Sequence, residues 1–154
     1  INHFLDQFKG TIYRQTMFAE FELEMGKMSE NGETLTADAL CKKYYELNKL
    51  YFGPDMVSDE EIALEWSRIP HFFYNYYVFQ YATGFSAAVA IANRILEKGA
   101  PAVADYKRFL SSGSSTDPIS LLKIAGVDMS SPEPINEALK LFGSLIDELD
   151  ALLK

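Results

Sequence analysis

The chain has 154 residues, a length typical of one domain, and 48% of them are hydrophobic, enough to fill an ordinary core. Acidic residues outnumber basic ones by 22 to 14, and the formal net charge is -8. No basic stripe is visible, so nucleic acid and anionic membrane surfaces are poor candidate partners. The single cysteine, Cys41, forms no internal disulfide and suits a reducing compartment. Because no signal-peptide pattern opens the chain either, we expect a cytoplasmic protein.

The first residues already follow a helical pattern. Ile1, Phe4, Leu5 and Phe8 are spaced as on one face of a helix, and no capping residue precedes them. A natural first segment is normally looser and more polar. We therefore expect residues 1–154 to be a piece of a longer protein.

Helical periodicity runs along the whole chain, and no β pattern of useful length appears. Thr36 is a predicted N-cap, Gly53 a predicted stop, and Ser58 a predicted N-cap of a short helix. Asp117 and Gly126 bracket another short helix in the same way. The predicted helices cover residues 1–28, 36–52, 58–66, 71–98, 101–110 and 118–125, and a last one follows Pro134. The sequence thus predicts an all-α fold, a helical bundle or part of one.

The helix predicted to follow Pro70 is unusually rich in polar aromatic residues. At 100° per residue, a helix from His71 onward gathers four side chains within an arc of roughly 120°. These four are His71, Tyr74, Tyr77 and Tyr81. The opposite arc carries Phe73, Tyr76 and Phe79 and is the predicted packing side. Such a helix has one face suited to hold a polar ligand.

Two plainer interpretations of this helix stay open. In the first, its tyrosines are core residues whose rings are buried and whose hydroxyls reach the surface. In the second, the helix crosses a membrane. The run from Phe72 to Ala92 carries no charge and is long enough to cross a bilayer. Against a membrane span, Asn75, Gln80 and the tyrosines fall where the aromatic belts of a spanning helix do not lie.

Most catalytic motifs are missing from the sequence. The two histidines, His3 and His71, cannot form the His-Glu-x-x-His motif of zinc proteases, and neither lies in the Glu-x-x-His motif of di-iron bundles. No phosphate-binding glycine loop is present, and no histidine is placed beside Cys41 or a particular serine. By elimination, the tyrosine-rich helix is the candidate site.

Four further residues have simpler expected roles. Arg14 and Glu20 interrupt an apolar helix, and we expect ion pairs with another helix, the alternative being a buried support for an active-site floor. Trp66 is expected to be a packing anchor that fixes where the tyrosine-rich helix begins. His3 is expected to be exposed.

Several of these segments together resemble one known family. The chain is similar to the C-terminal part of oligoendopeptidase F, the bacterial branch of the thimet-type zinc metallopeptidases. The resemblance covers essentially the whole chain. The matching segments are 14–22 (RQTMFAEFE), 69–84 (IPHFFYNYYVFQYATG), 106–110 (YKRFL) and 121–129 (LLKIAGVDM).

The resemblance implies a fold, a reaction and a role for this segment. Residues 1–154 would be the C-terminal segment of a larger, mostly helical catalytic domain. The zinc ligands and the catalytic glutamate would lie in its missing N-terminal part. His71 and Tyr77 would stabilise the tetrahedral intermediate as catalytic residues, and Tyr74 and Tyr81 would bind substrate. The intact enzyme would cleave short unstructured peptides, and the isolated chain would be inactive.

A second hypothesis belongs to a different class of protein. A helical binding or assembly module without catalysis would use the same tyrosine face to dock a partner helix or an apolar ligand.

Overall fold

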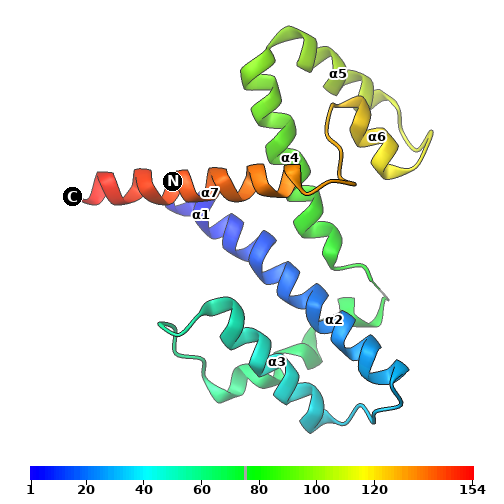
Figure 1. The fold of residues 1–154 in the computed structure, drawn as a ribbon, viewed down its shortest axis with the longest axis vertical. Coiled ribbons are helices and arrows are strands. Elements are labelled where there is room, and N and C mark those ends of the chain that lie inside the picture. The colour runs from blue at the N-terminus through cyan, green and yellow to red at the C-terminus, as the bar shows by residue number, and fades with distance from the viewer. Residues whose placement is uncertain (75) are drawn as a thin grey trace. The chain divides into compact units, whose positions relative to one another are not determined.

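The computed structural model describes residues 1–74 and 76–154 (Figure 1). All regular elements among them are helical, so the predicted all-α fold is confirmed. In chain order they are α1 (Asn2–Phe8), the π-helical turn η1 (Lys9–Tyr13), α2 (Arg14–Glu30), α3 (Ala37–Phe52), the 3₁₀ helices η2 (Glu60–Arg68) and η3 (Pro70–Phe73), α4 (Phe79–Lys98), α5 (Ala100–Ser111), α6 (Pro118–Ile124) and α7 (Glu133–Leu153).

The chain divides into two compact units. The tyrosine unit comprises Lys9–Ala82, and the terminal unit comprises Ile1–Phe8 with Thr83–Lys154. Each unit has a hydrophobic cluster of its own.

The core of the tyrosine unit lies between α2 and α3, which pack side by side (Figure 1). The ring of Phe21 meets those of Tyr44 and Phe72 edge to face, with both centroid distances 5.1 Å. Such edge-to-face pairs are favourable because a ring edge is positive and a ring face negative. The buried members of this cluster are Met17, Phe18, Phe21, Leu40, Tyr44, Leu47, Ile69, Phe72 and Val78. It forms the base on which the candidate site lies.

Helix α3 follows its sequence signals closely. The Thr36 side chain accepts a hydrogen bond from the backbone N–H of Ala39, as the predicted N-cap requires. Gly53 ends the helix at a φ of 78°, a conformation that costs a glycine little. The predicted cap at Ser58 is wrong, because its hydroxyl donates to Asn48 instead and η2 begins at Glu60.

A buried carboxylate joins three elements of the tyrosine unit. Glu65 accepts hydrogen bonds from Arg14 and from the Tyr44 hydroxyl, both at 2.6 Å, and it also pairs with Arg68. Burial opposes its ionisation, but the bonds from Arg14 and Tyr44 outweigh burial and hold the pKa of Glu65 below its usual value. The predicted ion pair of Arg14 with another helix is therefore confirmed. Glu20 instead accepts a hydrogen bond from the Tyr51 hydroxyl at 2.7 Å.

Trp66 packs against the same core, and its indole N–H donates to the sulfur of Cys41 at 3.4 Å. Its predicted role as a packing anchor is confirmed, although no long helix begins next to it.

The terminal unit contains α4, the contacting pair α5 and α6, and the contacting pair α1 and α7. Arg94 on α4 donates to the Ala125 carbonyl at 3.1 Å and to Asp105 at 2.6 Å, so it joins α4, α5 and the end of α6. Gly126 follows with a φ of 80°, and its Cα faces the Arg94 side chain closely. The chain reverses after α6 where only a glycine fits without strain.

None of the described helices combines the length and the apolarity that crossing a bilayer requires.

The first and fourth predicted helices need correction. The first is divided by the π-helical turn η1 and reaches Glu30. The predicted helix from residue 71 to 98 is wrong in its first part, because α4 begins only at Phe79. Tyr76 has a φ of 69°, which a right-handed helix cannot include. Asn75, predicted to lie in this helix, is outside the described residues.

Candidate functional site

The structure brings the four predicted site residues together, although by a route other than a helix face. His71 lies in η3, Tyr74 follows its last turn, Tyr77 lies in the connection, and Tyr81 lies in the first turn of α4. We call these four residues the aromatic cluster. His71 stacks on Tyr77 with ring centroids 5.4 Å apart and an interplanar angle of 12°. Tyr74 and Tyr81 meet the imidazole edge to face, at 6.2 Å and 5.6 Å.

One hydrogen bond fixes the imidazole within the cluster. The Tyr81 hydroxyl and His71 Nε2 lie 3.2 Å apart, and which of them donates depends on the histidine tautomer. The pKa of Tyr81 is raised, chiefly by its interaction with the Tyr77 hydroxyl and then by burial. A raised pKa keeps this phenol protonated at neutral pH. Tyr81 therefore presents a neutral hydroxyl to its neighbours.

The tyrosines of the cluster face solvent rather than a dry core. Tyr74 is 63% exposed, Tyr77 42% and Tyr81 40%. The interpretation of these residues as core aromatics is wrong, because none of the three is buried. An exposed group of rings with polar tips is a surface that a ligand can reach.

Buried residues on both sides fix this exposed segment to the body of the tyrosine unit. Phe72 and Val78 belong to the core cluster, and Val78 is fully buried. Between them, the backbone N–H of Tyr76 donates to Glu22 Oε1 on α2 at 2.8 Å. The Tyr76 side chain extends to Gly26, one turn further along α2. Tyr76 itself is not a member of the aromatic cluster. It lies between Tyr74 and Tyr77 in the chain and is held by contacts with α2.

Among the described residues, no metal site accompanies the cluster. Across residues 1–74 and 76–154, no three histidine, cysteine, aspartate or glutamate side chains lie close enough together to hold a metal ion. His71 is surrounded by tyrosine rings, and tyrosine is not among the usual ligands of zinc. The residues described here therefore do not fit a zinc ion.

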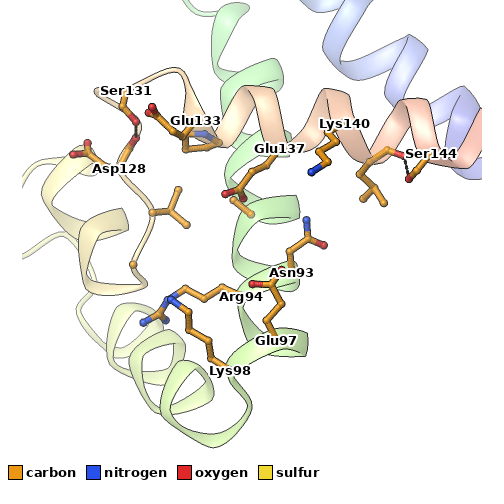
Figure 2. Close-up of a pocket in the computed structure, with 15 residues that line it drawn as sticks. Asn93, Arg94, Glu97, Lys98, Asp128, Ser131, Glu133, Glu137, Lys140 and Ser144 are labelled. Carbon is orange, nitrogen blue, oxygen red and sulfur yellow. Dashed lines mark hydrogen bonds between the residues drawn. The ribbon is translucent and has the colours of Figure 1, made fainter.

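A large cavity lies elsewhere, within the terminal unit. Figure 2 shows its lining by α4, α7 and the segment between α6 and α7, and its volume is about 680 Å³. Side chains of both charge signs face it, among them Glu97, Lys98, Glu137 and Lys140. Since no member of the aromatic cluster lines it, this cavity is not the predicted site.

Comparison with known proteins decides the family. The family model described as peptidase family M3 matches residues 1–141. The chain belongs to peptidase family M3. The predicted resemblance to oligoendopeptidase F is confirmed by relatives that carry this name.

Three relatives cover the chain almost completely. The oligopeptidase PepF of Bacillus subtilis is 58% identical over 99% of the chain, and the chromosomal oligoendopeptidase F of Lactococcus lactis subsp. cremoris is 44% identical over all of it. The crystal structure of oligoendopeptidase-F from Enterococcus faecium covers 99% of the chain at 49% identity, with a TM-score of 0.95. The chain spans 23% and 26% of the two relatives and 29% of the crystal structure's chain.

One residue that supports this site, Glu22, was not predicted from the sequence. Glu22 is buried, yet its carboxylate is directed at the segment that carries the aromatic cluster. A signal was present, since Glu22 and Gly26 are four residues apart on a predicted helix and therefore share one face.

Proposed function

We propose that residues 1–154 form the C-terminal segment of the catalytic domain of a zinc-dependent peptidase, and that the aromatic cluster is its substrate-binding wall. Membership of peptidase family M3 supports the reaction class. The observation that carries the proposal is the cluster itself, an imidazole held by three exposed phenols on a segment fixed to a rigid core.

The chemistry of peptide hydrolysis explains why such donors are useful. Attack on a peptide carbonyl builds negative charge on its oxygen. A donor placed about 2.7 to 3.1 Å from that oxygen stabilises the transition state more than the substrate, and so raises kcat. We assign this role to His71 and Tyr77. Their rings are stacked, so both side chains can approach the same substrate oxygen.

Tyr74 and Tyr81 are assigned to substrate binding. Tyr74 is the most exposed member of the cluster, and Tyr81 holds the imidazole through its hydrogen bond with Nε2. An extended peptide has free backbone N–H and C=O groups that such phenols can bind, whereas a folded protein has already paired most of its own. We therefore propose short unstructured peptides as substrates.

Zinc is assigned to the intact enzyme, with ligands outside the residues described here. A bound zinc ion would act as a Lewis acid. This chain supplies hydrogen bonds and shape, and its partner in catalysis would be the remainder of the polypeptide. A cytoplasmic location remains a prediction from composition, in particular from the lone Cys41.

Two activity measurements test this proposal. We expect the purified full-length protein to cleave short peptides, followed by chromatography and mass spectrometry, to lose activity with a chelator and to regain it with zinc. The 154-residue chain alone is expected to show no cleavage and no stoichiometric zinc in equilibrium dialysis. Chelator-sensitive cleavage by the isolated chain would contradict the assignment of the metal ligands.

The same assay separates the non-catalytic alternative. A full-length protein that retains peptides in equilibrium dialysis but never cleaves them, with or without zinc, would be a binding module. Translation of the gene upstream of the Ile1 codon gives an independent test, since a zinc peptidase requires a His-Glu-x-x-His motif there.

A further inference from the structure

The backbone of Tyr76 has a conformation that residues other than glycine rarely adopt. Its φ is 69°, and it is the one described non-glycine residue with a positive φ. Such a conformation persists only where its surroundings hold it, and residues of this kind concentrate at functional sites. Tyr76 lies directly before Tyr77, so its φ and ψ set the direction in which the chain presents the Tyr77 ring.

A buried carboxylate supplies the first point of attachment. Glu22 is only 5% exposed, and its Oε1 accepts the backbone N–H of Tyr76 at 2.8 Å. A buried carboxylate is costly unless it is hydrogen-bonded, and hydrogen bonds to an ionised acceptor are stronger than neutral ones. The bond therefore couples the burial of Glu22 to one particular backbone conformation 54 residues later in the chain.

A glycine one helical turn further supplies the second point. A Cβ added at Gly26 would lie 2.9 Å from the Tyr76 hydroxyl oxygen, closer than real Cβ contacts come. The absent side chain leaves the space in which the phenol lies. Glu22 and Gly26 are i and i+4 on α2, so one face of that helix holds both the backbone and the side chain of Tyr76.

We propose that Glu22 is a positioning residue of the active site, and that Glu22 and Gly26 together form a clasp that holds Tyr76. The clasp fixes the segment between the buried Phe72 and Val78, and thereby places Tyr77 against His71. The inference rests on the proposed function for its effect on catalysis. Glu22 acts through Tyr76 and is not itself assigned a contact with substrate.

Substitution of Glu22 in the full-length enzyme is the first test. Because misplacement by about 1 Å can cost a hundredfold in rate, we expect Glu22→Ala to lower kcat by about that factor with a much smaller change in KM. Glu22→Gln keeps an acceptor oxygen and should retain most of the activity. Glu30→Ala, an exposed glutamate on the same helix, is the matched control and should leave both constants unchanged.

A rescue variant separates positioning from a general structural role. Glycine adopts a positive φ without strain, so Tyr76→Gly placed in the Glu22→Ala background should restore part of the lost kcat. A double variant no better than Glu22→Ala, or a Glu22→Ala enzyme with wild-type kcat, would overturn the inference.

Gly26 keeps the inference testable if Glu22→Ala does not fold. Alanine is the better helix former, so Gly26→Ala should raise the melting temperature while it lowers kcat about threefold by displacing the Tyr76 phenol. Gly143→Ala on α7, where an added Cβ meets nothing within 4 Å, should raise the melting temperature without changing kcat. Equal effects of the two substitutions on kcat would contradict the clasp.

Hydrogen exchange distinguishes failure of the clasp from failure of the proposed function. In the full-length protein, Glu22→Ala should accelerate deuterium uptake in a peptide that contains the Tyr76 amide, measured by mass spectrometry, while Glu30→Ala should not. This readout requires no activity. Faster uptake in a protein that cleaves no peptide would support the clasp and reject the peptidase assignment, whereas unchanged uptake would reject the clasp whatever the activity.

Discussion

The imidazole of His71 lies nearly parallel to the phenol of Tyr77, with ring centroids 5.4 Å apart. The two residues are separated by a 3₁₀ turn and a left-handed residue, so their stacking depends on the path of the connection rather than on helical periodicity. A substitution that keeps the Tyr77 ring should preserve this stack, and the hydroxyl can then be tested by itself.

We expect Tyr77→Phe in the full-length enzyme to lower kcat by about a hundredfold or more, the usual effect of removing one oxyanion donor. KM should change little, because the hydroxyl is assigned to the transition state and not to ground-state binding. Steady-state kinetics on a short peptide gives both constants. Tyr106→Phe in the terminal unit is the control, and an unchanged kcat for Tyr77→Phe would remove the hydroxyl from the mechanism.

Tyr81→Phe tests the support of the imidazole. The substitution removes the hydrogen bond between the Tyr81 hydroxyl and His71 Nε2 while keeping the edge-to-face ring contact. We expect the rate to fall by about tenfold, less than for Tyr77→Phe, because the Tyr81 hydroxyl is assigned to substrate binding and to the support of His71 rather than to the transition state. The comparison is best made as kcat/KM with one peptide. A larger loss for Tyr81→Phe than for Tyr77→Phe would reverse the two assigned roles.

Glu65 predicts a pH dependence of stability. The pKa of Glu65 is lowered in the folded state. Its contribution to the free energy of unfolding is therefore complete above the unfolded-state pKa of about 4.3, and it is lost as pH falls through the folded-state pKa. Glu65→Gln should lower the free energy of unfolding by about 2 kcal/mol at neutral pH. The loss is smaller than for a fully buried ion pair, because the Arg14 side chain is 30% exposed.

Thermal unfolding at pH 7 and at pH 4 measures this effect. The difference in melting temperature between the two pH values should be smaller for Glu65→Gln than for the wild type. Glu60→Gln, an exposed neighbour on η2, serves as the control and should keep the wild-type pH dependence. A variant of Glu65 with an unaltered pH dependence would show that other carboxylates dominate acid unfolding.

Gly126→Ala should destabilise the terminal unit by about 1–3 kcal/mol, because the positive φ of this residue strains an alanine. A clash of the added Cβ with Arg94 should increase the loss. An added Cβ would lie 2.5 Å from Arg94 Nε. Gly113→Ala isolates the backbone effect, because its φ is 55° and no atom lies within 4 Å of the added Cβ. Denaturant unfolding of both variants gives the difference. Equal losses would mean that Arg94 moves aside without cost.

Local signals in the sequence predicted the elements whose ends are set by their own residues. Thr36 and Gly53 delimit α3, and Asp117, whose carboxylate accepts the N–H of Ser120, opens α6 as expected. Leu40, Tyr44 and Leu47 follow a helical spacing and form the buried face of α3. In these cases the physical cause lies within a few residues of the effect.

Interactions with distant residues decided the parts that the sequence did not predict. The helical pattern continues through residues 71–78, but the bond from Tyr76 to Glu22 holds a conformation that interrupts it. The four predicted residues still lie together, because a histidine and tyrosines this close in sequence meet around a tight turn. Their division into catalytic and binding roles stays a prediction, since that depends on where a substrate lies.

The position of Trp66 also provides a built-in probe. It is the single tryptophan of the chain, and it packs on the core of the tyrosine unit with its indole N–H on the Cys41 sulfur. Its fluorescence emission therefore reports on that unit, while the terminal unit contains no tryptophan. Chemical modification of the Cys41 thiol should change the emission intensity, so a single wavelength can follow both the folding of this core and the state of its cysteine.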